Sequence, residues 1–307
     1  MVLNEFPDLS WLKQQINSRF ENRAGWKGRV LKEQGWPTVL LNAKTSGISR
    51  DNIKGPFSLF GNLKGSSLVK VDNRKVSVNN DHFFLTNAGQ NYSLEIDEKS
   101  KTETFNIHFG DHFADELIQG QSSSIEKIMA EKFTTPLHSF SFHNRLIRKT
   151  KDINDLLVSL QCNKNELKEE ELLAKLFIEL FREELKLNET TKTLPSVKKS
   201  TREELLKRIL LSTDYIHEFY NQQLSLDELA SVSCLSKFHF LRLFKIAMGQ
   251  TPHQFITRVR IEKSKQLLNV SRQEIKQIAD LVGFPDSSSF SRAFYQNVGA
   301  YPSQFRA

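Results

Sequence analysis

The first third of the chain alternates short apolar runs with turn-forming residues. Between residues 29 and 109 these runs are rich in β-branched and aromatic side chains, which favour strands. Asp72-Asn73-Arg74 is typical of a hairpin, and residues 87–90 are typical of a turn. The regular turn spacing predicts a closed or sandwich-like β unit. Its predicted strands are residues 38–41, 57–60, 67–71, 75–78, 83–86, 92–96 and 102–109.

The last of these strands carries two kinds of side chain in strict alternation. Successive side chains of a strand point to opposite faces, so one face here is apolar and the other is polar. The apolar face is expected to pack in a core. The polar face could line an internal cavity or meet water, and the alternation allows both. The two sets are Phe105, Ile107 and Phe109, and Thr104, Asn106 and His108.

Helical periodicity dominates after the strands. Two helices are predicted at about residues 150–161 and 165–187. The second helix has a broad apolar stripe, which either packs on the β unit or forms a dimer seam. The stripe consists of Leu172, Leu173, Leu176, Phe177, Leu180 and Phe181. Further helical segments are predicted at residues 4–27 and 111–119, a loop is predicted at residues 121–124, and residues 125–143 are ambiguous.

A polar segment at residues 188–200 separates this part of the chain from the next. It lacks periodicity and contains Pro195, so it is predicted to be a linker. Thr201 is then expected to open a helix, because Glu204 follows it at the capping-box spacing.

Residues 225–307 contain one short pattern twice. One set of positions recurs 49 residues later: Leu226, Leu229, Ala230 and Leu235 match Ile275, Ile278, Ala279 and Phe284. A second set recurs 50 residues later: Phe240, Arg242, Phe244, Gly249, Pro252 and Phe255 match Phe290, Arg292, Phe294, Gly299, Pro302 and Phe305. The offset grows by one inside the turn, so the second copy has one extra turn residue. A repeat of this kind predicts two copies of one supersecondary unit.

Each copy is predicted to be a helix, a tight turn and a second helix. Ser225 and Glu228 have capping-box spacing, and Gly249 ends a second helix that begins near Ser236. That helix has an apolar face and, opposite it, a cationic one: Phe240, Leu243, Phe244 and Ala247 against Phe238, Leu241, Arg242 and Lys245. In the second copy Phe290 and Phe294 repeat the apolar face, and Ser288, Ser291, Arg292 and Tyr295 repeat the outer one.

A helix-turn-helix with arginine on its second helix fits the DNA major groove, where arginine can bind guanine O6 and N7. The alternative is a plain helical hairpin whose outer face is solvated. Matching arginines in both copies favour the DNA-binding interpretation.

The segment resembles the DNA-binding domain of the AraC/XylS family of bacterial transcription regulators. The residues that carry the resemblance are Ser-Lys-Phe-His-Phe-Leu-Arg-Leu-Phe-Lys at 236–245, Gly-Gln-Thr-Pro at 249–252, Gly-Phe at 283–284, Phe-Ser-Arg-Ala-Phe at 290–294 and Gly-Ala-Tyr-Pro-Ser-Gln-Phe at 299–305. The resemblance covers about a third of the chain. It implies two helix-turn-helix units, joined by a long helix at about residues 252–268, that enter adjacent major grooves.

The resemblance and the helix faces together assign expected roles at this surface. Arg242 and Arg292 are the expected base contacts. The expected groove-surface residues are Phe238, Leu241, Ser287, Ser288 and Ser291. The residues expected to meet phosphates, which position a protein without carrying sequence information, are Lys237, His239 and Lys245. Leu241 departs from the polar residue usual in the family and could touch a thymine methyl group.

Residues 81–96 resemble, more loosely, the cupin-like sensor domain common in the same family. The implied fold is α+β: a cupin-like β-barrel with flanking helices, followed by an all-α domain of two helix-turn-helix units joined by a long helix. The implied domains are a sensor and dimerisation domain at residues 1–187, the linker at 188–200 and a DNA-binding domain at 201–307. The implied partners are double-stranded DNA, a small-molecule effector, a second copy of the chain and RNA polymerase.

The charge distribution agrees with a polyanion partner at the C-terminal end. The chain of 307 residues has a formal net charge of +7. Residues 1–190 carry 26 basic and 26 acidic side chains, whereas residues 191–307 carry 17 and 10. The whole excess therefore lies after residue 190, which favours nucleic-acid binding by that part.

Several other classes of protein find no support in the sequence. No apolar run is long enough for a membrane span, and residues 1–7 do not begin a secretory signal, so a cytoplasmic protein is expected. Cys162 and Cys234 make no disulfide framework. His108 and His112 are separated by Gly110 and Asp111, so no metal site is expected.

A cofactor and an enzymatic activity are not expected either. Residues 61–65 lack the spacing of a phosphate-binding loop, and Cys162 lacks a basic neighbour arranged to activate it. Two alternatives stay open: a cupin-like enzyme fused to a DNA-binding module, and a regulator that binds no effector.

Overall fold

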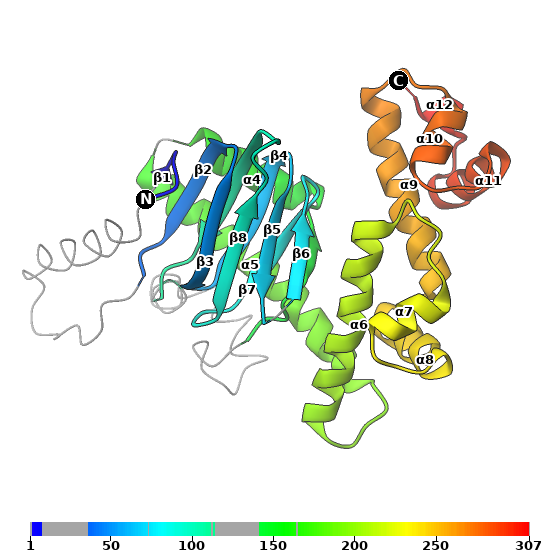
Figure 1. Ribbon diagram of the computed structural model, residues 1–307, viewed down its shortest axis with the longest axis horizontal. Helices are drawn as coiled ribbons and strands as arrows, with labels where there is room; N and C mark the ends of the chain where they lie inside the picture. Colours follow the sequence, from blue (N-terminus) through cyan, green and yellow to red (C-terminus); the bar gives the residue numbers. More distant parts are fainter. Residues whose placement is uncertain are drawn as a thin grey trace, which may run out of the picture. The chain divides into compact units, whose positions relative to one another are not determined.

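The computed structural model describes residues 2–7, 36–72, 74–111, 113, 141–163 and 165–306 (Figure 1). The chain divides into two compact units, Met1–Glu184 and Leu185–Ala307. The described part of the first unit combines β-sheets with helices, and that of the second is helical. This arrangement agrees with the predicted α+β class.

The strands of the first unit form two sheets. The six-stranded sheet has the order β1 (Val2–Leu3), β2 (Val39–Thr45), β9 (Thr102–His108), β4 (Ser58–Lys64), β7 (His82–Thr86) and β10 (Leu146–Arg148). The four-stranded sheet has the order β3 (Ile48–Lys54), β8 (Asn91–Ile96), β5 (Ser67–Val71) and β6 (Arg74–Val78). The pairing is antiparallel throughout the described strands, except that β1 runs parallel to β2.

All seven predicted strands are present, as β2 and β4 to β9. The predicted hairpin joins β5 to β6, and Asp72 adopts a left-handed φ of 48° in its turn. The sequence pattern does not predict β1, β3 or β10. In β3 the reason is composition, because Ile53 is its one buried residue and the others are largely polar. Strands β1 and β10 are too short to give a periodic signal.

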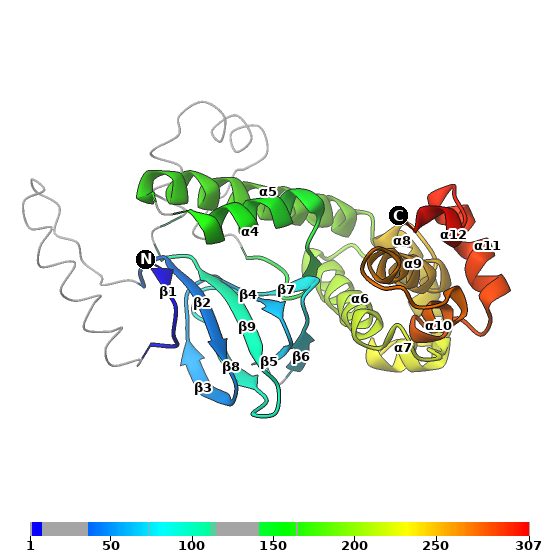
Figure 2. The same ribbon diagram turned by 90° about the horizontal axis from the view of Figure 1, so that it is seen from above.

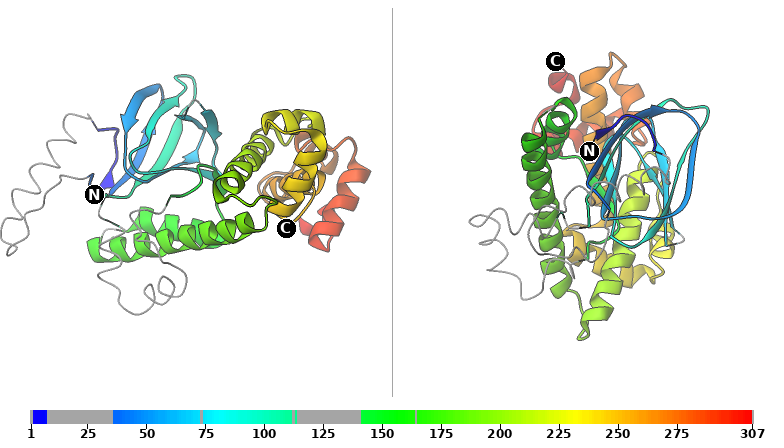
Figure 3. Two further views of the ribbon diagram at one scale, coloured as in Figure 1. Left: turned by 90° about the horizontal axis from the view of Figure 1, so that it is seen from below. Right: turned by 90° about the vertical axis from the view of Figure 1, so that its left-hand side faces the viewer.

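The two sheets face each other across an apolar core (Figure 3). Phe60 and Phe84 from the six-stranded sheet meet Val69, Tyr92 and Leu94 from the four-stranded sheet. No described strand pairs with members of both sheets. The β unit is therefore an open sandwich, which is one of the two forms that the turn spacing predicts. The chain crosses between sheets from β2 to β3 without a ladder, so the cupin-like sheets are not closed into the barrel that the resemblance implies.

Helices α4 (Lys151–Cys162) and α5 (Glu166–Lys192) lie over the six-stranded sheet (Figure 2). Aromatic rings fix this packing: Phe177 of α5 lies 5.5 Å from Phe109 and 5.9 Å from Phe57, measured between ring centroids. The six residues of the predicted apolar stripe on α5 are all buried within the chain. Packing on the β unit is thus the correct alternative for this stripe, and a dimer seam would have to use another surface.

The segment predicted as a linker is mostly helical. Helix α5 continues to Lys192, and α6 (Lys199–Phe219) begins with Lys198 as its N-cap, which makes no side-chain capping bond. Residues 193–198 form the connection, which is shorter than the predicted linker at 188–200. Thr201 lies inside α6 and does not cap it. Leu194 is buried against the core of the second unit, which explains why the short connection is ordered.

The second unit contains two small cores that share one long helix. The first core collects α6, α7 (Leu226–Val232), α8 (Lys237–Met248) and the first half of α9 (Pro252–Val270). The second collects the other half of α9 with α10 (Ile275–Leu281), α11 (Ser287–Val298) and α12 (Pro302–Phe305). Phe255 and Val259 of α9 belong to the first core, and Ile261 and Leu268 belong to the second.

The predicted repeat is confirmed helix by helix. Helix α10 has the same length as α7 with the 49-residue offset, and α11 matches α8 with the 50-residue offset. Ser225 makes both bonds of the predicted capping box with Glu228. Gly249 and Gly299 end α8 and α11 with φ of 68° and 80°. The predicted segments at 4–27, 111–119, 121–124 and 125–143 lie largely outside the described residues.

Candidate nucleic-acid interface

Helix α8 separates its predicted core face from its outer face. Phe240, Leu243 and Phe244 are fully buried, and Ala247 is 8% exposed. On the other side, Phe238 is 86% exposed. His239, Arg242 and Lys245 are also exposed, and Leu241 is half-buried. An aromatic ring left open to solvent at the start of a helix has no packing role, so it is available to a partner surface.

The cationic side chains of α8 differ in whether they have an ion-pair or hydrogen-bond partner. Arg242 and Lys245 make no hydrogen bond or ion pair with any described residue. Lys237 pairs with Asp227 of α7, with 2.8 Å between Nζ and Oδ2. Both members of this pair are exposed, so the pair contributes little and can exchange for a phosphate.

Helix α11 presents a smaller and less charged surface. Ser288 and Arg292 are exposed, whereas Ser287 and Ser291 are half-buried. Asp286 caps the helix by accepting the Ser289 amide at 2.7 Å. Hydrogen bonds from Ser289 lower the pKa of Asp286, and the charge of Arg292 lowers it further. A carboxylate therefore stands near Arg292, while Arg242 has no such neighbour among the described residues.

A stacked tyrosine pair continues the outer face of α11. Tyr295 and Tyr301 lie 4.8 Å apart between ring centroids, and each is 48% exposed. The repeat aligns them with Lys245 and Thr251 of the first copy. The sequence placed Tyr295 on the outer face but gave no reason to single out Tyr301, because the contact depends on how α12 turns back. Copy two thus has a hydroxyl-bearing aromatic surface where copy one has a cation.

The tight turns of the two copies share a left-handed backbone position. Cys234 has φ of 50° and Gly283 has φ of 90°. A Cβ atom at Gly283 would lie 2.6 Å from the backbone oxygen of Asn221, so this turn sits directly on the end of α6. The thiol of Cys234 is free and exposed.

Arg260 of α9 connects the same region. Its Nε donates to the carbonyl of Tyr220 at 2.7 Å, and its second terminal nitrogen donates to that of Gln222 at 2.7 Å. Its guanidinium also lies 5.6 Å from the ring centroid of Phe284. The end of α6, the long helix and the second turn are therefore joined by one side chain, which helps to fix the two helix-turn-helix units relative to each other within the second unit.

The first unit has a cavity between its two sheets. It is lined mainly by apolar and aromatic side chains, together with Arg50, Tyr92, Asn106 and His108. Asn106 and His108 of the polar face predicted for β9 therefore line a cavity, whereas Thr104 of the same face is buried and donates to the Ala43 carbonyl. Among the described residues, no group of three or more His, Cys, Asp or Glu side chains could hold a metal ion. In the described part of the chain, no helix is long and apolar enough to cross a membrane.

Comparison with known proteins gives one family match. Residues 229–307 match the family model described as "Helix-turn-helix domain". "Probable transcriptional regulator LumQ" of Photobacterium leiognathi is 38% identical over 34% of this chain and 41% of its own length. An uncharacterized HTH-type transcriptional regulator of Staphylococcus aureus (strain COL) is 28% identical over 80% of this chain and 30% of its own length. The chain thus spans less than half the length of these relatives.

A solved structure is similar to part of the chain. The C-terminal domain of the two-component response regulator yesN from Fusobacterium nucleatum subsp. nucleatum is 30% identical, covering 32% of this chain and 95% of that one with a TM-score of 0.31. The residues that match the family model, 229–307, contain both helix-turn-helix units except the start of α7. Residues 229–307 therefore carry a helix-turn-helix domain similar to that of relatives named as transcriptional regulators.

Proposed function

We propose that the protein is a sequence-specific DNA-binding transcription regulator whose two helix-turn-helix units occupy adjacent major grooves. The observation that carries the proposal is the outer face of α8, where Phe238, Arg242 and Lys245 are exposed together on a helix whose opposite face is buried. The major groove is wide enough to admit such a helix, and the side chains on its exposed face can then reach base edges.

The two copies are proposed to contribute unequally. Arg242 reads a base, with Leu241 and Phe238 against the groove surface, while Lys237, His239 and Lys245 contact phosphates. In copy two, Arg292 is the base contact and Ser287, Ser288 and Ser291 lie at the groove. The serines are short, and Asp286 competes for Arg292, so copy two reads fewer bases than copy one.

The first unit is proposed to sense a small-molecule effector in the cavity between its sheets. Effector binding then changes how the DNA-binding unit is presented. A homodimer that reads two such sites, contact with RNA polymerase and a cytoplasmic location follow from this role as parts of the proposal. An enzyme fused to a DNA-binding module gains no support from the cavity, since its lining among the described residues supplies one imidazole and no carboxylate or thiol.

Replacing Arg242 with alanine should weaken binding to the cognate site by about 1–3 kcal/mol and relax specificity at one base pair. The reason is the loss of a bidentate contact to a guanine. Fluorescence anisotropy on the cognate site and on single-base variants of it measures both effects.

Two matched variants distinguish recognition of a base from non-specific electrostatic attraction to the DNA backbone. Lys245→Ala should weaken binding to all DNA sites to a similar extent. It should also reduce the slope of log affinity against log salt concentration by about the amount expected for one phosphate contact. Lys207→Ala removes one charge from the exposed side of α6 and should change little. Equal weakening of every site by Arg242→Ala would show that Arg242 does not read a base.

A further inference from the structure

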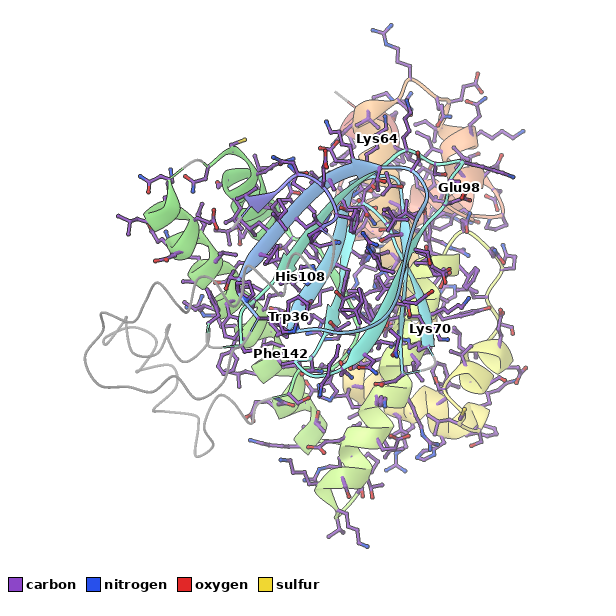
Figure 4. All side chains as sticks on the ribbon, turned by 60° about the vertical axis from the view of Figure 1, so that its left-hand side comes forward. Trp36, Lys64, Lys70, Glu98, His108 and Phe142 are labelled. Atoms are coloured by element: carbon purple, nitrogen blue, oxygen red, sulfur yellow. The ribbon has the colours of Figure 1, made fainter. Side chains whose placement is uncertain are left out.

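The cavity of the first unit combines apolar walls with a few polar groups that lack partners. It has about 590 Å³ of empty space, a figure that includes the open solvent at its mouth. Trp36 and His108 lie close together at this end of the sandwich (Figure 4). Its aliphatic walls come from both sheets, with Val39 and Leu41 facing Ile53 and Leu94.

His108 offers a hydrogen-bond acceptor to the cavity. Ser58 Oγ lies 2.9 Å from His108 Nδ1 and also donates its hydrogen to the carbonyl of Pro56 at 2.8 Å. Because that hydroxyl hydrogen is already used, His108 Nδ1 must carry the proton and donate to Ser58. Burial lowers the pKa of His108 to about 4, so the ring is neutral at pH 7. Its Nε2 is therefore an unprotonated acceptor, and it has no partner among the described residues.

Asn106 and Tyr92 offer donors beside it. The side-chain carbonyl of Asn106 accepts the Gly61 amide at 3.1 Å, but Asn106 Nδ2 is buried and has no partner. An unsatisfied buried amide is costly, and a ligand oxygen in the cavity would relieve that cost. Burial raises the pKa of Tyr92, so its hydroxyl stays protonated, and that hydroxyl also has no described partner.

The walls around these groups are aromatic and carry one charge. Phe60 lies edge-on to both Tyr92 and His108, at 4.8 and 5.7 Å between ring centroids, and the rings of Tyr92 and His108 are near parallel. Flat walls of this kind favour a planar ring. Arg50 lines the cavity without a carboxylate partner among the described residues. Its terminal nitrogen donates to the Pro7 carbonyl over a long distance of 3.4 Å. Within the described part of the chain, no acidic side chain lines the cavity.

We propose that the cavity binds a hydroxy-substituted aromatic carboxylate, with the carboxylate at Arg50, the ring between the aromatic and aliphatic walls, and the hydroxyl at His108 and Asn106. The hydroxyl donates to His108 Nε2 and accepts from Asn106 Nδ2, so both unsatisfied groups gain a partner. This inference rests on the proposed function, because it names the class of effector that the regulator would sense.

Isothermal titration calorimetry of the full chain at pH 7 tests the proposal. The probes are 3-hydroxybenzoate, 4-hydroxybenzoate and 4-hydroxyphenylacetate, and we expect at least one to bind. Benzoate lacks the hydroxyl and 4-hydroxybenzyl alcohol lacks the carboxylate, so each should bind about tenfold or more weakly. The proposal is wrong if none of the three binds, if both comparators bind as well as they do, or if decanoate or glucose binds more tightly.

Two charge variants on β3 tie binding to the cavity. Arg50→Gln should remove the preference for the acid over the alcohol, because it removes the cation at the carboxylate. Lys54→Gln makes the same change of charge on the same strand, but Lys54 is exposed and does not line the cavity, so the preference should persist. An unchanged preference in Arg50→Gln would place the ligand elsewhere and overturn the assignment.

A DNA-binding measurement on the same preparation distinguishes a wrong effector class from a wrong proposed function. If the protein binds DNA through Arg242 but none of the probes, the effector class is wrong and the proposed function stands. If the probes bind with the expected Arg50 dependence but DNA does not, the proposed function is wrong and the cavity assignment stands.

Discussion

Replacing Gly283 with alanine should destabilise the second helix-turn-helix unit by about 2–4 kcal/mol and abolish tight DNA binding. Two costs add. Gly283 has φ of 90°, a conformation that costs an L-residue about 1 kcal/mol or more. An added Cβ would also lie 2.6 Å from the Asn221 oxygen and 2.8 Å from its carbonyl carbon, so backbone must move. Forcing such a shift in a packed region costs about 1–3 kcal/mol.

The matched control for this change is Gly299→Ala. Gly299 also has a left-handed φ, of 80°, but no atom lies within 4 Å of its added Cβ. Only the conformational cost of about 1 kcal/mol is therefore expected. Urea unfolding of both variants, followed by circular dichroism and by DNA-binding affinity, measures the difference. Equal destabilisation of the two would mean that the contact between Gly283 and the end of α6 is absent.

Replacing Glu184 with alanine should destabilise the first unit by about 3–5 kcal/mol. The Glu184 side chain is fully buried, accepts the His143 backbone amide at 3.0 Å, contacts His143 Nδ1 and pairs with Arg145 at 3.4 Å. The Arg145 side chain is only 13% exposed, and its Nε already lacks a partner. Removing the carboxylate leaves a cation buried without a counter-charge, which is more costly than losing an exposed pair.

The comparison for Glu184 lies on the same helix. Glu179 pairs with Arg182 on the exposed side of α5, so Glu179→Ala should cost less than about 1 kcal/mol. Denaturant midpoints of the full chain, read from the first unit's strand signal, distinguish the two variants. A Glu184→Ala protein that is as stable as Glu179→Ala would show that the buried pair does not hold α5 in place.

The helical repeat was predictable because its information is local. Helix lengths, glycine stops and the split of α8 into buried and exposed faces all follow from residue spacing, and the structure has them at the expected offsets. The strands with β-branched and aromatic side chains were predictable for the same reason.

Features that depend on contacts between distant segments were not predictable. Strand β3 is polar and exists because β8 pairs with it. The register of this pairing shifts between Arg50 and Ile53, and both residues line the cavity. Glu184 looks like one more charge on the polar side of α5, and it is buried because His143 and Arg145 meet it. The unsatisfied Nδ2 of Asn106 could likewise not be foreseen. The orientation of that side chain depends on its carbonyl oxygen accepting the amide of Gly61, which lies 45 residues away.

The central claim is that the two helix-turn-helix units read adjacent major grooves, with the first copy dominant. Hydroxyl-radical footprinting of the full chain, on a site selected from a random DNA library, tests this most directly. The account predicts two protected segments centred about 10 base pairs apart on one face of the DNA. It also predicts that Arg242→Ala weakens the whole footprint more than Arg292→Ala does. A single protected segment, or a footprint unchanged by Arg242→Ala, would contradict the account.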